Sequence, residues 1–283
     1  MKQLRIAIVG YGTAGQAAAV LLTRDGHDVS VFERVPEPGP VGAGFLLQPS
    51  GLQVLWRMGL LPAVLTHGVR VDRLFGDTPC GRPVMDMRYD GLEARLYGVG
   101  LQRGALFSIL AGAFEGHRDI RAGTAIAAID DDGRVLVDAA GERHGPYDLV
   151  VVADGAASLL RGHVGRVRLD KPYPWGALWC LLPAGAWPWT SELRQRYVAA
   201  RRMVGLLPVG ARPDDPTRRL SFFWSLRADR FAHWEAAGFD AWREELHALW
   251  PEAASVFGGL ADAGQLARAR YRDTILRRWH RGR

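Results

Sequence analysis

Three glycines near the start of the chain have the residue type and the spacing of a turn that binds a dinucleotide. Gly10, Gly12 and Gly15 follow a short apolar run in the order G-x-G-x-x-G, and a stretch rich in alanine and leucine comes next. The first glycine allows a tight turn, the second lets a pyrophosphate approach the backbone, and the third lets a helix lie close to a strand. The helix, expected over residues 16–23, would direct its free N–H groups at the pyrophosphate, and Thr13 and Ala14 within the turn are further candidates to contact it. The sequence therefore predicts a pyrophosphate site over residues 10–15.

Glu33 is the acid that completes this pattern. It ends a second apolar run, residues 29–32, where a carboxylate can accept hydrogen bonds from an adenosine ribose. An acid here favours a ribose without a phosphate, so FAD and NAD both satisfy the pattern. The alternative is a glycine turn in an unrelated α/β unit. The complete order of strand, turn, helix, strand and acid favours the dinucleotide.

Beyond Glu33 the sequence predicts an α/β fold into which antiparallel strands are inserted. A loop rich in proline and glycine, which includes Gly44, precedes a helix. Short strands separated by turns are expected at 71–75, 84–87 and 94–97. A buried parallel strand is expected before Asp154 and Gly155, which then lie at its carboxyl end, where open α/β sheets bind ligands. A purely structural Asp-Gly turn is the alternative.

The second half of the chain predicts further antiparallel strands that are rich in aromatic residues. They are expected at 175–182, 203–207 and 220–226, with prolines between them. The aromatic candidates to line an apolar substrate pocket are Trp175, Trp179, Phe222 and Trp224. Packing against a covering layer is the alternative role for such side chains.

The net charge of +6 comes from one segment. Residues 268–283 hold seven arginines and one aspartate, so the preceding part of the chain sums to zero. A nucleic-acid-binding domain would carry a basic face on its folded body. Apolar residues also interrupt the arginine run, as they do in an ordinary structural segment. We therefore expect no nucleic-acid partner.

The composition is that of a globular protein, with 283 residues of which 48% are apolar and 23% charged. No apolar run approaches the roughly 18 residues that cross a membrane. Cys80 and Cys180 are too few for a disulfide framework, and neither they nor the eight histidines have metal-ligand spacing. We expect a soluble cytoplasmic protein with free thiols, no metal and no membrane partner.

Three motifs in order resemble those of the flavoprotein monooxygenases of the para-hydroxybenzoate hydroxylase fold, the single-component aromatic hydroxylases. The first is the glycine turn with its ribose acid. The second is an Arg-x-x-Leu-x-x-x-Leu segment beside the flavin, matched by Arg103, Leu106 and Leu110. The third is D-G-x-x-S-x-x-R near the pyrophosphate, matched over residues 154–161. The resemblance covers nearly the whole chain.

This resemblance implies a Rossmann-like FAD-binding domain with an interleaved antiparallel-sheet substrate domain. FAD, reduced by NAD(P)H, would use O2 to hydroxylate an apolar, aromatic small molecule. Besides the glycine turn and Glu33, the cofactor would contact Arg34, Gly44, Arg103, Ile126, Asp154 and Gly155. No catalytic side chain is assigned. The FAD-binding domain would comprise residues 1–70 and 101–168, and the substrate domain residues 71–100 and 169–283.

Two departures from the family pattern bear on activity. Val152 stands where glycine is frequent, which should affect strand packing only. Family members also continue with a strand, a Gly-Asp motif that binds the flavin, and a helix, whereas the only Gly-Asp here, Gly76-Asp77, is expected in a hairpin turn. The alternative function is a non-catalytic remnant, or one part of a split flavoprotein. We expect this chain alone to bind FAD weakly, and to self-associate or pair with a C-terminal segment through an open sheet edge.

Overall fold

Two compact units divide the chain. The computed structural model describes residues 2–39, 42–114, 119–130 and 132–282. The first unit contains Met1–Pro40, Phe107–Pro172 and Arg272–Arg283, and the second contains Val41–Leu106 and Tyr173–Tyr271. Three elements continue from one unit into the other: α4 (Arg103–Phe114), β13 (Val167–Pro183) and β17 (Ala267–Leu276).

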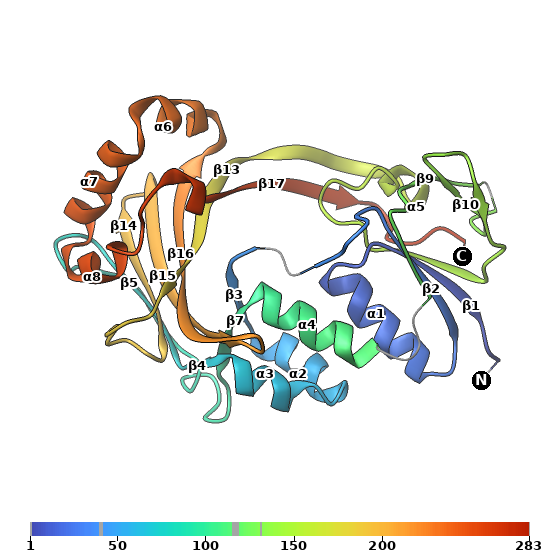
Figure 1. Cartoon of the computed structure of the whole chain (residues 1–283), viewed down its shortest axis with the longest axis horizontal. Helices are drawn as coiled ribbons and strands as arrows, with labels where there is room; N and C mark the ends of the chain where they lie inside the picture. The colour runs from blue at the N-terminus through green and yellow to red at the C-terminus, as the bar shows by residue number, and fades with distance from the viewer. Residues whose placement is uncertain (1, 40–41, 115–118, 131, 283) are drawn as a thin grey trace. The chain divides into compact units, whose positions relative to one another are not determined.

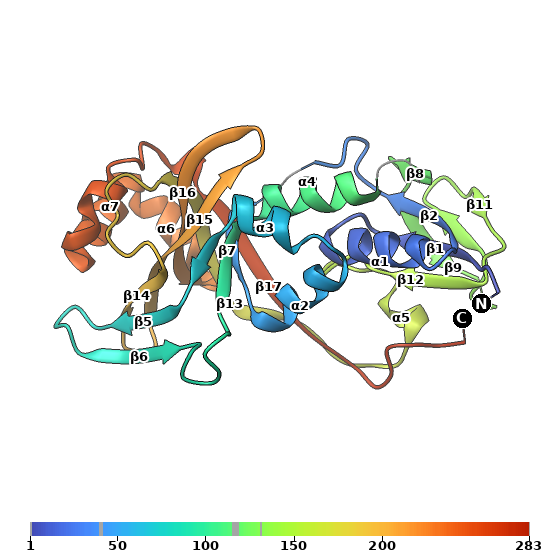
Figure 2. The same cartoon turned by 90° about the horizontal axis from the view of Figure 1, so that it is seen from below.

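A four-stranded parallel sheet forms the centre of the first unit (Figures 1 and 2). Its strand order is β12-β1-β2-β8, with β1 at Arg5–Val9, β2 at Asp28–Glu33, β8 at Asp119–Ala122 and β12 at Leu149–Val152. Ile6 and Ile8 are fully buried, as expected for a parallel sheet covered on its faces. Helix α1 (Thr13–Arg24) connects β1 to β2 and buries Ala19 and Val20.

A small antiparallel sheet completes this unit. It consists of β9 (Ile126–Ile129), β10 (Leu136–Asp138) and β11 (Arg143–His144). Leu136 from this sheet, Phe32 from β2 and Tyr147 share one apolar cluster with strand β1. The cluster therefore fixes the small sheet beside the end of β2 that carries Glu33. A short helix, α5 (Arg161–Val164), follows β12.

A seven-stranded sheet dominates the second unit. Its order is β17-β13-β16-β15-β14-β5-β6, with β5 at Arg73–Asp77, β6 at Pro83–Arg88, β14 at Glu192–Val198, β15 at Arg202–Arg212 and β16 at Asp215–Arg227. Strands β14 and β5 pair in parallel, whereas β13–β16, β15–β16, β14–β15 and β5–β6 are antiparallel pairs. The hairpin of β5 and β6 forms one end of the sheet (Figure 2).

Helices cover one face of this sheet. They are α6 (Phe231–Ala237), α7 (Phe239–Leu249) and α8 (Ala254–Phe257), which lie together on one side of the strands (Figure 1). Leu178, Leu206 and Phe222 point from three strands into the core that they form with Trp242 and Trp250. Because successive residues of a strand point to opposite faces, their neighbours lie on the other side. We call that side the opposite face, and its central residues are Trp175, Ala177, Trp179, Gln195, Tyr197, Met203, Gly205, Phe223 and Ser225.

A three-stranded antiparallel sheet packs against one end of the opposite face. Its strands are β3 (Gly44–Leu47), β7 (Gly98–Gln102) and β4 (Val69–Val71), and helices α2 (Pro49–Arg57) and α3 (Leu61–His67) lie between them in the chain. Gln102 Nε2 donates to the carbonyl oxygen of Gly210 at 3.0 Å. This end of the face is therefore buried, as Leu207 and Val209 show.

The predicted fold class, a Rossmann-like parallel sheet with interleaved antiparallel sheet, is confirmed. The division of the chain differs from the predicted boundaries, because β3 and β4 pair with β7 and stay with the second unit. The last residues also differ, since Arg277 N donates to the Arg166 carbonyl oxygen at 3.0 Å within the first unit. Gly76-Asp77 ends strand β5 instead of forming a turn.

Candidate cofactor site and substrate face

The glycine turn lies at the carboxyl end of β1, and its three glycines serve different purposes. A Cβ added to Gly10, whose φ is 103°, would lie 2.5 Å from the Ala153 carbonyl oxygen, and one added to Gly15 would clash with the Gly10 carbonyl oxygen. These two positions require glycine for packing. Gly12 differs, because its φ of −76° suits any residue and no atom lies within 4 Å of an added Cβ. The open space above Gly12 is where a ligand would approach the backbone.

The amino end of α1 adds unpaired donors at the same place. Gly12 is the N-cap of this helix and provides no side-chain cap. The first N–H groups of a helix have no partner within it, and together they form an anion site of partial positive charge. Thr13 and Ala14, two of the predicted cofactor residues, begin the helix here, three residues before the predicted start at Gln16.

Glu33 lies across the turn from these donors, with both carboxylate oxygens already bound to backbone. Oε2 accepts a hydrogen bond of 2.8 Å from the Tyr11 N–H, and Oε1 accepts one of 2.9 Å from Val35 N–H. Its carbonyl oxygen also accepts from Thr124 N–H at 2.9 Å, which fixes the loop that leads to Ile126. Arg34 is exposed beside it. The structure therefore brings the predicted ribose acid, Arg34 and the Ile126 backbone to one side of the turn.

Two buried polar groups behind the turn were not foreseen from the sequence. Tyr11 packs edge-on against Phe107 with ring centroids 5.8 Å apart, and Gln16 Nε2 donates to the Phe107 carbonyl oxygen at 3.4 Å. Tyr11 Oη and Gln16 Oε1 have no hydrogen-bond partner among the residues that the structure describes. Helix α4 is thereby packed against the start of α1. Nothing in the spacing of the motif marks these residues.

The Asp-Gly motif lies after β12, at the same edge of the parallel sheet. Gly155 has a φ of 85°, which favours glycine, and its carbonyl oxygen accepts from Ser158 N–H at 3.1 Å. Arg161 donates to the Ala156 carbonyl oxygen and to Asp170, each at 2.8 Å. Ser158 of this motif does not cap the helix that follows. Residue 160 is the N-cap, and Ser158 Oγ is buried with no partner among the described residues.

Asp170 links the Asp-Gly motif to β17, because it pairs with both Arg161 and Arg272. Hydrogen bonds and charge from Arg272, and then from Arg161, hold the pKa of Asp170 below its ordinary value. A cavity of about 950 Å³ lies beside them, and its walls include the backbone of β12, Arg161, Arg272 and residues 279–282. Strand β12 is at the end of the sheet order, with β1 on one side and no other strand on its far side in the described residues.

The other two predicted cofactor residues lie in the second unit. Arg103 begins α4, its N–H donates to the Ala43 carbonyl oxygen at 3.0 Å, and its guanidinium lies 5.7 Å from the Phe45 ring. Gly44 N–H donates to Ser221 Oγ at 3.1 Å, and an added Cβ would clash with Val209. Packing within the second unit therefore accounts for the glycine at position 44, without a ligand.

The predicted substrate residues divide between the two faces of the seven-stranded sheet. Phe222 and Trp224 are 0% and 2% exposed and belong to the core under the helices, so assigning them to a substrate pocket needs correction. Trp175 and Trp179 are on the opposite face and are partly exposed. There Trp179 Nε1 donates to Tyr271 Oη at 3.1 Å, and its ring centroid is 5.1 Å from that of Phe223. Phe223 and Tyr271 are the residues that sequence reasoning missed.

Comparison with known proteins identifies the family. A family model described as an FAD binding domain matches residues 3–283. The chain belongs to this family.

Named relatives agree with this assignment. The kynurenine 3-monooxygenase of Salinispora arenicola (strain CNS-205) is 33% identical over 205 residues, which cover 64% of this chain and 43% of that protein. The 3-amino-4-hydroxybenzoate 2-monooxygenase of Streptomyces cremeus is 33% identical over 171 residues, covering 58% and 43%. The chain thus spans less than half the length of these curated relatives.

The tetrameric form of 2-methyl-3-hydroxypyridine-5-carboxylic acid oxygenase shares the fold. Its TM-score is 0.83 at 22% identity, over 100% of this chain and 74% of that one. The resemblance to flavoprotein monooxygenases is confirmed.

The residues of the first unit fit the FAD of this family. Gly12 leaves space for a pyrophosphate that no protein atom fills. The free N–H groups of α1 supply positive partial charge for it, and Glu33 supplies an oriented acceptor for a ribose. The fit therefore rests on three separate features of the turn.

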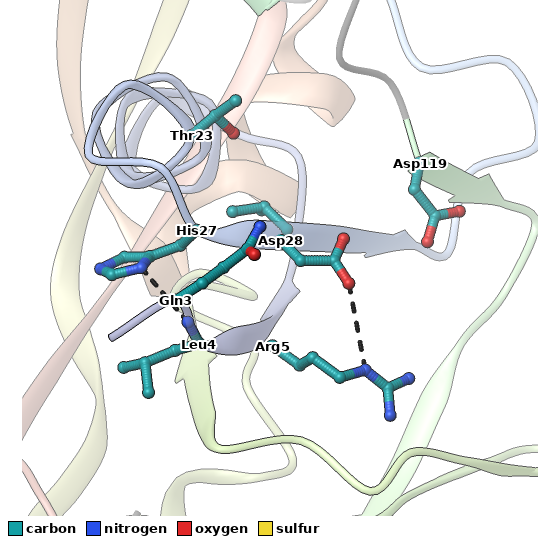
Figure 3. A pocket seen from close by; sticks show the side chains of 8 residues that line it. Gln3, Leu4, Arg5, Thr23, His27, Asp28 and Asp119 are labelled. Atoms are coloured by element: carbon teal, nitrogen blue, oxygen red, sulfur yellow. Dashed lines mark hydrogen bonds and ion pairs between the residues drawn. The ribbon is translucent and has the colours of Figure 1, made fainter. Parts of the chain in front are cut away.

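A second hollow in the first unit lies at the wrong end of the sheet for this cofactor. It has a volume of about 390 Å³ and lies near the starts of β1 and β2, where Gln3, Arg5, His27 and Asp28 surround it (Figure 3). His27 Nδ1 accepts from Leu4 N–H at 3.4 Å, and the Arg5 and Asp28 side chains are 3.9 Å apart. Ligands of open α/β sheets bind at the carboxyl ends of the strands.

One cluster in the FAD-binding unit has the distances of a metal site but not its chemistry. Suitable atoms of Asp138, Glu142 and His144 lie within 4.8 Å of one another. However, Arg121 Nη1 lies 3.3 Å from His144 Nδ1, and Asp138 lies 3.0 Å from Nε2. Arginine can only donate, so Nδ1 accepts from Arg121 and Nε2–H donates a hydrogen bond to Asp138. A cation would need that nitrogen deprotonated.

The arginine-rich end of the chain is engaged in contacts with its own fold. Arg268 pairs with Glu235 and lies over Trp234, Arg270 lies over Phe231, and Arg272 pairs with Asp170. These arginines pack on the sheet and its helices. Within the described part of the chain, no helix combines the length and apolar character that a membrane span needs.

Proposed function

We propose that this chain provides the FAD-binding and substrate-binding units of a monooxygenase that hydroxylates an apolar, aromatic small molecule with NAD(P)H and O2. The observation that carries the proposal is Gly12. Neither the backbone angle nor the packing at position 12 requires a glycine, whereas packing requires glycine at positions 10 and 15. A ligand that must approach the backbone gives that glycine a purpose.

Each residue of the turn has a distinct part in binding. The turn over residues 10–15 holds the pyrophosphate through the free N–H groups of residues 12–15, because the Gly10 and Tyr11 N–H groups already donate to Phe32 and Glu33. Glu33 accepts from the adenosine ribose, and Arg34 with the Ile126 backbone flanks the adenosine end. Asp154 and Gly155 follow at the same sheet edge, whereas Arg103 and Gly44 are assigned to the cofactor by their motifs alone. When bound, FAD supplies the electron transfer from NAD(P)H to O2 that hydroxylation requires. The protein binds and orients it.

The substrate is assigned to the opposite face of the seven-stranded sheet. Trp175 and Trp179 are partly exposed there, and Phe223 and Tyr271 contact Trp179. Aromatic side chains offer large flat surfaces to a flat ring. The 3-amino-4-hydroxybenzoate and hydroxypyridine named for two relatives are aromatic, which supports an aromatic substrate here.

The test is FAD affinity of the purified chain, measured by quenching of flavin fluorescence. Gly12→Val places a branched side chain where the pyrophosphate must lie, so we expect FAD binding to be lost. Gly112→Val in α4 is the matched control, because an added Cβ there also meets no atom within 4 Å. Equal FAD affinity in Gly12→Val and Gly112→Val would refute the proposal.

A second candidate is a non-catalytic or split form that needs a partner segment. The unpaired edge of β12 and the cavity of about 950 Å³ beside it favour this candidate. An exposed strand edge is a template for pairing with another segment or another copy. Native mass and bound flavin of the purified chain, measured with and without an added segment, test this candidate. It predicts tighter flavin binding when the segment is present, whereas a chain that needs no partner shows no change.

A further inference from the structure

A row of residues crosses the opposite face of the seven-stranded sheet. Backbone register places its members side by side, one per strand, in the order Trp179, Phe223, Gly205, Gln195 and Gly76. A ring covers each glycine: a Cβ on Gly205 would clash with the Phe223 ring, and one on Gly76 would clash with the Tyr197 ring. The two glycines let these rings lie low on the sheet. Trp179 and Tyr197 are partly exposed, and Phe223, which is 8% exposed, packs against Trp179, so these three rings form the aromatic platform.

The polar groups around this platform are all neutral. Tyr197 Oη donates to Gln195 Oε1 at 3.0 Å, and Gln195 Nε2 donates to Met203 Sδ at 3.3 Å. Met203 N–H in turn donates to Ser225 Oγ at 2.8 Å. Burial raises the pKa of Tyr197, so its phenol stays protonated at neutral pH. The hydroxyl of Tyr271, which accepts from Trp179, keeps its own proton to donate to a ligand.

Charged side chains near the platform point elsewhere or are already paired. On β14, Arg196 turns to the helix side, where it pairs with Asp77 at 2.9 Å, and Arg194 stacks on Phe75 at 4.2 Å. The arginines at the two ends of β16 pair with aspartates at 2.8 and 2.9 Å, Arg227 with Asp229 and Arg219 with Asp215. Among the described residues, the five positions of the row hold no charged side chain, and the charged residues nearest to it on this face, Arg227 in register with Trp175 and Asp273 two residues after Tyr271, lie toward one end.

We infer that this face takes an uncharged planar aromatic ring and discriminates against a ring that carries a carboxylate. A carboxylate buried against the platform would lose its water and gain no cation, which is strongly unfavourable. The 3-amino-4-hydroxybenzoate and pyridine carboxylic acid named for two relatives carry that group, so the chain departs from them in substrate class. The inference rests on the proposed function, which assigns the substrate to this face.

Matched pairs of ligands test the inference, because an amide and a carboxylate have nearly the same shape. The probes are benzamide against benzoate, and 2-aminobenzamide against 2-aminobenzoate, measured by equilibrium dialysis with the purified chain and saturating FAD. We expect each amide to bind about tenfold or more tightly than its acid. Trp179→Ala should weaken amide binding, whereas Trp56→Ala, on a side chain of α2 that is 65% exposed, should leave it unchanged.

A gain of function makes the test stricter. Met203 lies on the platform side of β15, so Met203→Arg supplies the missing cation, which can bind a carboxylate through paired hydrogen bonds. We expect the preference of this variant to reverse in favour of the acids, while the neutral control Met203→Gln keeps the preference for amides.

Equal or tighter binding of the acids by the unaltered chain overturns the inference, as does binding of neither member of a pair. Flavin fluorescence in the same samples reports separately on the proposed function, because FAD can bind normally while the charge preference fails.

Discussion

The backbone N–H of Tyr11 donates a hydrogen bond of 2.8 Å to the carboxylate of Glu33 and so ties the glycine turn to the end of β2. The second carboxylate oxygen accepts from Val35 N–H at 2.9 Å. Both oxygens are therefore oriented by backbone donors in the absence of a ligand. Such pre-organisation lowers the entropy lost when a ligand binds.

Replacing Glu33 should weaken FAD binding by a different amount in each of two variants. Glu33→Ala removes a charged acceptor, and hydrogen bonds to charged groups contribute about 1.5 to 3 kcal/mol, which corresponds to roughly a tenfold to hundredfold loss of affinity. Glu33→Gln keeps one acceptor oxygen, so its FAD affinity should lie between those of the original chain and Glu33→Ala. Flavin fluorescence quenching measures all three proteins. If Glu33→Ala bound FAD as tightly as the original chain, the ribose assignment would be wrong.

Asp170 should make the first unit sensitive to acid. Because Arg272 and Arg161 lower its folded pKa, its contribution to stability is complete above the ordinary aspartate pKa of about 3.9 and is lost as the pH falls through the lowered value. We therefore expect Asp170→Asn to lower the melting temperature at pH 7 and to lower it much less at pH 2 to 3. Arg272→Gln should shift the acid transition to higher pH more than Arg161→Gln, because Arg272 is the larger cause. A melting-temperature difference independent of pH would contradict this account.

The pairing of Phe223 with Gly205 should be measurable as coupling between the two positions. Gly205→Ala forces a methyl group into the Phe223 ring, and overpacking of this kind typically costs about 1 to 3 kcal/mol. The same substitution in a Phe223→Leu background should cost less, because the smaller side chain leaves space. Urea unfolding of the two single variants and the double variant gives the coupling free energy. Additive effects would show that the ring does not occupy the space above Gly205.

Local chemistry was sufficient to predict the glycine turn and the strands and helix around it. Gly10, Gly12, Gly15 and Glu33 are set by the order of one strand, one helix and the next strand, and their contacts with one another span a short stretch of chain, whereas the packing of Gly10 against Ala153 does not. The same reasoning could not foresee Tyr11 and Gln16 against Phe107, because that contact depends on where α4 packs. Gly44 illustrates a further limit, since a loop glycine that suggested a ligand is explained by packing against Val209 and Ser221.

The substrate face shows why side-chain type alone was not enough. Phe222, Phe223 and Trp224 are consecutive aromatic residues, so no alternation of polar and apolar residues marks which of them face the helices. Only the position of α6, α7 and α8 decides that Phe222 and Trp224 are core while Phe223 faces away. The compact units differ from the predicted boundaries for a similar reason, because β3 pairs with β7, which lies far along the chain.

The open edge of β12 carries the last prediction, which concerns this chain with and without an added segment. Strand β12 has β1 on one side only in the described residues, and the cavity of about 950 Å³ beside it is lined by residues 279–282. A family-like C-terminal segment joined after Arg283 would be delivered to that edge, and it would add donors to the flavin. Two or three hydrogen bonds to charged groups, each contributing about 1.5 to 3 kcal/mol, would raise FAD affinity by several orders of magnitude. We therefore expect the 283-residue chain to bind FAD weakly and to self-associate, and the extended chain to bind FAD tightly as a smaller species.

Bound flavin, NAD(P)H oxidation and native mass measure this, with a scrambled segment of the same composition as the control. Stoichiometric, tightly bound FAD and full turnover by a monomer of the 283-residue chain would show that the edge of β12 needs no partner.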